Sequence, residues 1–212
     1  MSLVGAVVKC EQGDSRKIPA VAVFCRSIRL DGIRGEEDSP AMLISKALGD
    51  KINEQIGHEF AASIQYTAIA AHFDAESLPF LARHFYKQAS EEHDHAMKFI
   101  KFLIDAGFPV EIPAIAKPVP KFSFAEDALK LSFEQEVKVT DLINALMDLS
   151  LKENNHIAAT FLQWFVTEQL EEVSSMDQLL KIIQRAGEGN LLLVEQYLAG
   201  YKGAGTSASL GE

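Results

Sequence analysis

The stretch ASEEHDHAM, residues 89–97, decides the fold because it places charged side chains where a helix should be apolar. At the helical repeat, Glu92 and His95 fall on one stripe of that helix. The other members of the stripe are apolar: Leu81, Phe85, Ala89, Ala96, Phe99 and Leu103. A carboxylate on a core-facing stripe is costly unless another group neutralises it. The stretch therefore predicts a buried helix whose acid binds a partner.

Three further helical stripes carry the same anomaly. Glu59 lies among Ile52, Ile56, Ala62 and Tyr66; Glu136 lies among Leu129, Phe133, Ile143 and Met147; and Glu168, Gln169 and Glu172 lie among Leu162, Phe165, Val173, Met176 and Leu180. No Lys or Arg stands beside these acids on the stripes. A divalent or trivalent metal is the simplest neutralising partner, and carboxylates with one imidazole form a hard ligand set that suits iron.

The spacing of these residues predicts how the helices pair. The interval from Glu59 to Glu92 along the chain equals the interval from Glu136 to Gln169. Two similar helical hairpins, each with one ligand per arm, would give this equal spacing. Packed together, they form a four-helix bundle whose polar groups converge at mid-height. The halves are not identical, since the first reads Glu92-x-x-His95 and the second Gln169-x-x-Glu172.

Start and stop signals divide the chain into helices and connections. We expect helices from about 39–40 or slightly later to His72, from 77 to 106, from a capping box at Ser123 and Glu126 to about Glu153, and from the Asn154-Asn155 link to Ala186, with a short apolar helix after Asn190. Residues 107–122 contain four prolines and predict a long crossover. The result is an all-α domain over 39–199, preceded by an extension (1–38) and followed by a flexible Gly/Ala/Ser tail (200–212).

Composition excludes several classes of protein. The chain has 212 residues, is 48% hydrophobic and carries a formal net charge of −10, which argues against a nucleic-acid partner. Its two cysteines, Cys10 and Cys25, make no disulfide framework, so we expect a reducing cytoplasm. No apolar run approaches the ~18 residues that span a membrane. The run IPAVAVFC (18–25) predicts a strand or arm rather than a signal peptide, because acids precede it.

Three segments resemble the bacterial non-haem ferritins: NEQIGHEF (53–60), EEHDH (91–95) and FLQWFVTEQLEE (161–172). The resemblance covers about residues 42–198. It implies a ferritin-like four-helix bundle with a long crossover between the second and third helices and a short fifth helix. It also implies iron storage and detoxification, with Fe(II) oxidised by O2 at a di-iron centre and mineralised inside a closed shell of 24 identical subunits.

The resemblance also implies a ligand set. Glu59, Glu92 and His95 would hold the first iron, and Glu92, Glu136 and Gln169 the second, with Glu92 bridging the two. Tyr66 matches the tyrosine that stands near the centre in this family. Glu91, Glu168, Glu171 and Glu172 match a third, weaker iron site on the inner side.

Three departures limit what can be carried over. The related bacterioferritins bind haem through a Met that follows the bridging Glu, and here that residue is His93, so we expect no haem. They also have a His three residues after the last-helix Glu, where this chain has Glu171. Animal ferritins line an iron channel with two acids, and the matching positions here are Ala159 and Leu162. The iron route is therefore not predicted.

Several alternatives remain open. Gln169 can be read as a core amide, Glu171 and Glu172 as ordinary surface acids, and Tyr66 as a core aromatic without a redox role. As a whole, the chain can be read as a haem-binding protein of the bacterioferritin kind, or as a helical assembly protein with a vestigial centre. A di-iron enzyme with another substrate, as in the rubrerythrins, is a further reading, but the chain has no CxxC pair.

Overall fold

The structure is a computed structural model that describes residues 42–200, and every regular element in that range is helical. The predicted extension (1–38) and the tail beyond Gly200 lie outside the described residues. The elements are α1 (Lys46–Ala75), α2 (Pro79–Asp105), α3 (Ala125–Lys152), α4 (His156–Ala186), the short 3-10 helix η1 (Glu188–Asn190) and α5 (Leu191–Gly200). Within 42–200, no helix combines the length and the apolar character needed to cross a membrane.

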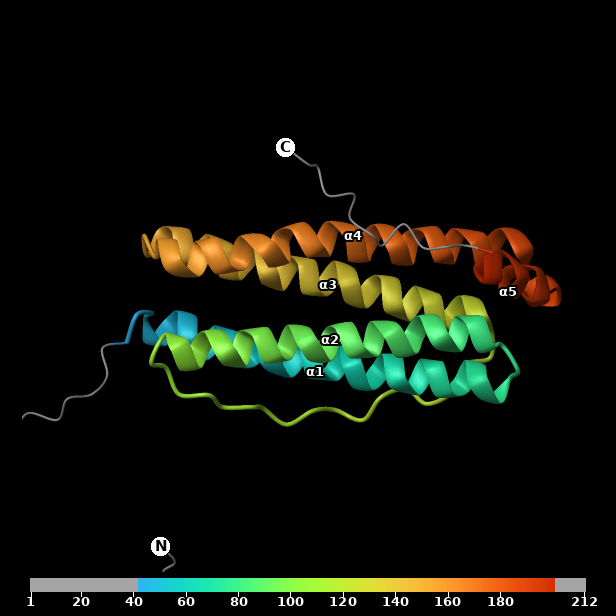
Figure 1. Ribbon diagram of the computed structural model, residues 1–212, viewed down its shortest axis with the longest axis horizontal. Helices are drawn as coiled ribbons and strands as arrows, with labels where there is room; N and C mark the ends of the chain where they lie inside the picture. Colours follow the sequence, from blue (N-terminus) through green and yellow to red (C-terminus); the bar gives the residue numbers. More distant parts are fainter. Residues whose placement is uncertain (1–41, 201–212) are drawn as a thin grey trace, which may run out of the picture. The chain divides into compact units, whose positions relative to one another are not determined.

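The helices form a bundle of two hairpins, α1 with α2 and α3 with α4 (Figure 1). The crossover between α2 and α3 runs along the length of the bundle, so α3 starts at the end where α2 also starts. As a result α1 packs against α3 in the antiparallel sense, and α2 faces α4. The predicted all-α bundle with a long crossover and a short fifth helix is confirmed.

Two helix starts differ in detail from the predicted signals. Ser45 is the N-cap of α1, and its hydroxyl accepts a hydrogen bond from the Leu48 backbone N–H at 3.0 Å. Phe124 is the N-cap of α3, so the predicted capping box at Ser123 is wrong. The Glu126 backbone N–H is bonded instead to Oε1 of Glu188, at 3.2 Å. A side chain beyond the end of α4 therefore replaces the local cap.

Two amides on α1 hold the crossover in place. Asn53 donates to the Pro109 carbonyl at 3.1 Å and accepts from the Glu111 N–H at 2.8 Å. Gln65 bonds both backbone groups of Val119 in the same way, at 3.0 and 2.8 Å. Each side-chain amide thus supplies the two hydrogen bonds that a neighbouring strand would otherwise give to this extended segment. The crossover is fixed along α1 at both ends of its course.

The core consists of two apolar clusters at different heights of the bundle. One lies near α5 and includes Tyr66, Phe85 and Met176, and the other lies near the start of α1 and includes Ile56, Phe99 and Phe165. Along each long helix, the chain passes from one cluster to the other across a polar position. The core is therefore interrupted at mid-height, where the sequence places its buried acids.

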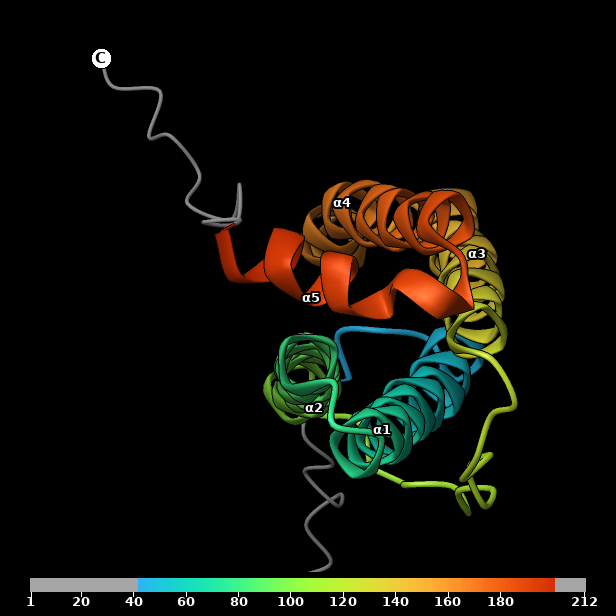
Figure 2. The same ribbon diagram turned by 90° about the vertical axis from the view of Figure 1, so that its right-hand side faces the viewer.

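The fifth helix lies across one end of the bundle, between α4 and α2 (Figure 2). Its Glu195 is only 7% exposed and accepts hydrogen bonds from the backbone N–H groups of Phe80 and Leu81, at 2.8 and 2.9 Å. These donors belong to the first turn of α2, whose N-cap Leu78 provides no side-chain bond. A carboxylate at a helix N-terminus interacts favourably with the helix dipole. It also accepts hydrogen bonds from the first backbone N–H groups, which have no partner within the helix. Glu195 thus attaches α5 to the start of α2.

Candidate metal centre

Six polar side chains occupy the interruption between the two apolar clusters, and we call them the polar layer. They are Glu59 of α1, Glu92 and His95 of α2, Glu136 of α3, and Gln169 and Glu172 of α4. All six are at most 5% exposed. No Lys or Arg is among the buried polar residues of the described chain. The layer therefore holds four carboxyl groups in the core without a cationic side chain to balance them.

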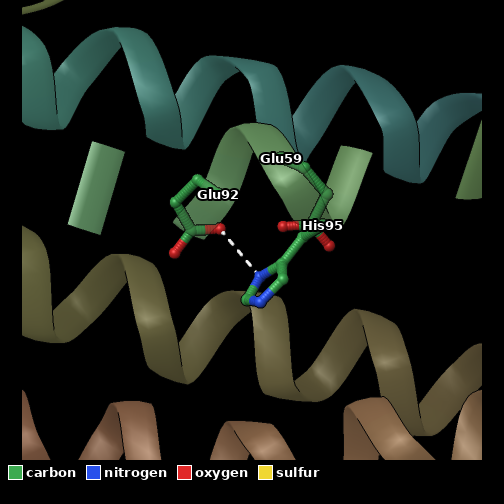
Figure 3. Close-up of side chains that lie close together, drawn as sticks. All are labelled: Glu59, Glu92 and His95. Carbon is green, nitrogen blue, oxygen red and sulfur yellow. Dashed lines mark ion pairs between the residues drawn. The ribbon is translucent and has the colours of Figure 1, made fainter. Parts of the chain in front are cut away.

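Three members of the polar layer lie close enough together to hold one metal ion. One ligand atom each from Glu59, Glu92 and His95 lies within 4.8 Å of the other two. Glu59 enters from α1, while Glu92 and His95 point from adjacent turns of α2 into the same space (Figure 3). His95 Nδ1 lies 3.4 Å from Glu92 Oε2. The i, i+3 spacing places both side chains on one helix face, as the sequence predicts.

The opposite hairpin supplies the remaining groups. The Tyr66 hydroxyl, from α1, donates a hydrogen bond to Glu136 Oε1 across the bundle. Gln169 is buried on α4, and its carbonyl oxygen accepts a hydrogen bond from the Thr140 hydroxyl at 3.1 Å. The same hydroxyl is 2.8 Å from the Glu136 backbone carbonyl. With its carbonyl oxygen fixed in this way, Gln169 can offer that atom as a weak ligand.

In each of the three central carboxylates, of Glu59, Glu92 and Glu136, one oxygen contacts a polar neighbour and the other does not. Gln55 Nε2 donates to Glu59 Oε1 at 2.8 Å, Tyr66 donates to Glu136, and Glu92 Oε2 faces His95. The second oxygens, Glu59 Oε2, Glu92 Oε1 and Glu136 Oε2, are buried and accept no hydrogen bond from any described residue. Buried oxygens without a donor are rare in proteins. Three in one layer indicate a site built for cations.

The sequence patterns do not predict two residues that support the polar layer. Gln55 and Gln88 are buried, 1% and 4% exposed, and each precedes a ligand Glu by one helical turn. The interval between them equals the one that separates Glu59 from Glu92. Gln55 bonds the Glu of its own helix, whereas Gln88 Nε2 bonds Glu172 Oε2 on α4 at 2.7 Å. The repeated spacing was the available signal, but it does not say which acid each amide takes.

Burial raises the pKa of every acid in the layer. Desolvation is the largest cause for Glu59 and Glu92, and a neighbouring carboxylate is the next: Glu92 in the first case and Glu136 in the second. Both pKa values lie well above the ordinary one. Burial also raises the pKa of Glu136 and of Glu172 to about 7. Desolvation and the Glu136 charge raise the pKa of Tyr66, so its phenol stays protonated.

The four acids expected at a third site lie in different surroundings. Glu172 is buried beside Gln88, while Glu171 is exposed. Glu168 is 28% exposed, with its Oε1 3.9 Å from His95 Nε2. Glu91 is 33% exposed and forms an ion pair with Lys87 at 2.7 Å. The structure therefore brings Glu172 and Glu168 to the polar layer and leaves Glu171 at the surface, on a different face of α4.

An aromatic shell fixes the imidazole of His95. The rings of Trp164 and Phe165 both meet it edge-on, with centroids at 5.4 and 5.8 Å. Lys98 Nζ lies 4.0 Å from the centre of the Trp164 ring on the solvent side. Neighbours that hold a histidine ring also set the direction of its ligand nitrogen. The imidazole is thus oriented before any metal binds.

The polar layer offers hard oxygen ligands, one imidazole and unsatisfied lone pairs. This ligand set suits Fe, Mn or Zn ions better than soft metals, because it contains no sulfur. Cations would replace the protons that the raised pKa values keep on the acids. Glu136, on the opposite hairpin, is buried in the same layer but is not one of the three residues whose ligand atoms converge. Chemically, the arrangement can bind divalent cations and stabilise a higher charge on them.

Comparison with known proteins gives one consistent result. Residues 49–186 match the family model described as a ferritin-like domain. The chain is 45% identical over 148 residues to a ferritin BfrB of Mycolicibacterium smegmatis, covering 70% of this chain and 81% of that protein. It is 33% identical over 158 residues to a bacterial non-heme ferritin of Staphylococcus aureus, with 74% and 95% covered. The fold is similar to that of an open pore ferritin of the hyperthermophilic archaeon Archaeoglobus fulgidus, with a TM-score of 0.72, 29% identity, and 75% and 99% of the chains covered.

The raised pKa of Glu136 predicts how the stability of the metal-free protein depends on pH. Between the ordinary value of 4.5 and the folded value of about 7, the folded chain binds more protons than the unfolded chain, so stability falls as pH rises. We expect Glu136→Gln to be more stable than the parent at pH 8, by about 2 kcal/mol. The gain should shrink towards pH 5. Calorimetry of chelator-treated protein measures both values.

The matched control for this experiment is Glu134→Gln, which makes the same change of charge on an exposed position of α3. It should leave the unfolding temperature within about a degree of the parent at both pH values, as surface substitutions usually do. A Glu136→Gln protein that is less stable than the parent at pH 8 would contradict the assigned direction of the pKa shift.

Proposed function

The chain belongs to the ferritin-like family, whose function is iron storage, and from that premise we propose that it oxidises Fe(II) with O2 at the polar layer. The oxidised iron then passes into a protein shell, where it mineralises. The observation that carries the proposal is the set of half-held carboxylates: Glu59, Glu92 and Glu136 each keep one buried oxygen without a donor among the described residues.

We assign the two irons by proximity. Glu59, Glu92 and His95 would bind the first Fe(II), because their ligand atoms already converge within 4.8 Å. Glu136 and Gln169 would bind the second, with Glu92 shared between the two ions. Glu136 is close enough to Glu92 to raise its pKa, which supports a bridging position for Glu92. Fe(II) is here a substrate, bound in place of the protons on these acids.

The negative charge of the acids favours the oxidation of Fe(II). Several carboxylates in a buried site favour Fe(III) over Fe(II), since the higher charge gains more from the same ligands. Two Fe(II) ions give one electron each, and these two electrons with two protons convert one O2 to hydrogen peroxide. Tyr66 positions Glu136 through its hydroxyl, and we propose that this hydroxyl exchanges a proton with Glu136 during turnover.

The acids on the α2 and α4 side fit the next step, the transfer of Fe(III) away from the centre. Glu172 is buried beside the ligands, Glu168 is partly exposed next to His95, and Glu91 is partly exposed on α2. These groups form a graded series from the core to the surface. We propose that they make up a third site, with Glu172 its inner member and Glu171 its most exposed one.

Two alternatives lose support. A haem site loses its specific support because His93 stands where the bacterioferritins have a Met; His93 is exposed, and its ring contacts that of Phe60, with centroids at 5.6 Å. A vestigial centre in a purely structural assembly protein would have lost one or more of its ligands. All of the central acids and His95 are present and buried. We therefore propose a catalytic, non-haem ferritin that acts in the cytoplasm.

We propose that the shell contains 24 subunits, and the mass of the intact chain checks this. Light scattering at physiological salt should give about 560 kDa, which is 24 copies of the 23.3 kDa chain. Exposed Leu192 and Leu193 on α5 are candidates for contacts between copies. A dimer as the largest species would refute the shell without touching the oxidation chemistry.

Removing two ligands of the first iron tests the oxidation. Stopped-flow mixing of Fe(II) with aerobic Glu92→Ala/His95→Ala protein should show no fast phase, at least a hundredfold slower than the parent, since both irons lose a ligand. Glu134→Ala/His156→Ala is the matched control, because both residues are exposed and away from the layer. A parent-like trace from the ligand variant would refute the proposed site.

Single variants separate Glu172 from Glu171. Glu172→Gln should leave the first two-iron oxidation within about threefold of the parent, yet lower the number of Fe(II) ions bound per chain and slow later turnovers. Glu171→Gln should change both quantities less than Glu172→Gln does, because that side chain is the most exposed member of the third site. Calorimetric iron titration with stopped-flow measures both. An initial rate in Glu172→Gln as low as in the ligand double variant would contradict the division of roles.

A further inference from the structure

A hollow of about 210 Å³ lies between α1 and α3, on the side of the bundle away from α2 and α4. Its lining is contributed by four residues of each helix: Lys51, Glu54, Gln55 and His58, with Leu142, Ala145, Leu146 and Leu149. The whole α3 wall is aliphatic. Nothing in the function proposed above uses this hollow.

The hollow ends one side chain away from the metal ligands. Gln55 lines it, and the amide nitrogen of the same side chain donates to Glu59 Oε1 at 2.8 Å. Gln55 is only 1% exposed, so its amide forms an inner wall of the hollow rather than part of the surface. A rotation of this one side chain would connect the hollow with the polar layer. Such a rotation breaks the hydrogen bond between Gln55 and Glu59.

The charges around the hollow are unsuited to a cation. Its only carboxylate, Glu54, is paired with Lys51 at 2.5 Å. A neighbouring hollow of about 340 Å³ shares His58 and Leu142 with it and adds Lys117, Lys138 and Glu134, so its lysines outnumber its carboxylate. The positive charges of these two lysines repel Fe(II). Cations are instead attracted to the opposite side of the centre, where acids stand on α4.

We propose that this hollow is the site through which O2 reaches the centre, with Gln55 as the gate, while Fe(II) arrives from the α2 and α4 side. The inference rests on the function proposed above. O2 is small, neutral and apolar, and aliphatic cavities of comparable size take up apolar guests such as xenon. Separate routes keep the gas path free of bound cations. They also leave Glu59 next to the incoming oxidant.

Filling the hollow tests the proposal by the dependence of the rate on O2. Ala145 is exposed on the α3 wall, so Ala145→Phe should fold normally and block the space. We expect the KM for O2 to rise about threefold or more, with kcat at saturating O2 and the rate of anaerobic Fe(II) binding unchanged. Ala145→Ser keeps the hollow open and should behave as the parent. Ala116→Phe makes the same change in the neighbouring hollow, which does not touch Gln55, and should also behave as the parent.

Xenon binding to the hollow provides a test that does not depend on catalysis. Crystals pressurised with xenon should show the gas in the hollow of the parent and not in Ala145→Phe. An unchanged KM for O2 in Ala145→Phe overturns the proposal, and so does slower anaerobic binding of Fe(II), which would make the hollow a cation route. If the parent oxidises no Fe(II), the proposed function fails; absence of xenon from the hollow then overturns the gas site as well.

Discussion

Four carboxyl groups buried at mid-height of the bundle are the constraint on which the rest of the structure depends. They split the core into two apolar clusters, and no cationic side chain among the described buried residues balances them. The metal-free chain meets this cost by keeping protons on the acids and by holding one oxygen of each central group with Gln55, Tyr66 or His95. The apolar clusters on either side keep the helices rigid, so the ligand atoms of Glu59, Glu92 and His95 stay close together. A cation that binds there relieves the cost of burying these carboxyl groups, and this relief favours its binding.

The buried acids and His95 of the polar layer were predictable from sequence, because a charged residue on an apolar helical stripe is an unusual pattern. Glu59, Glu92, His95 and Glu136 each stand at such a position, and the equal intervals within the two halves of the chain predict that they meet. The supporting contacts were not predictable, because amides are common on both core and surface. Whether Gln88 bonds Glu92 on its own helix or Glu172 across the bundle depends on side-chain directions that spacing does not contain. The capping box at Ser123 failed for a related reason, since a distant Glu188 occupies that end of α3.

The two sides of the centre differ in charge, and this difference links the site to its substrates. Acids on α2 and α4 lead from Glu172 in the core to the surface, whereas the hollow between α1 and α3 has an aliphatic α3 wall and lysines beside it. A cation and an apolar gas are therefore offered different paths to the same ligands. Gln55 would then have two roles: it bonds Glu59 before metal binds, and it separates the O2 path from the acids.

The most direct test of the central claim, that the polar layer is a two-iron centre, is anomalous scattering at the iron edge from crystals soaked anaerobically with Fe(II). We expect two strong peaks about 3.5–4 Å apart, the separation of two-metal sites, with Glu92 between them. Glu59 and His95 should flank one peak and Glu136 the other. Iron confined to the exposed acids, or a polar layer without any peak, would contradict it.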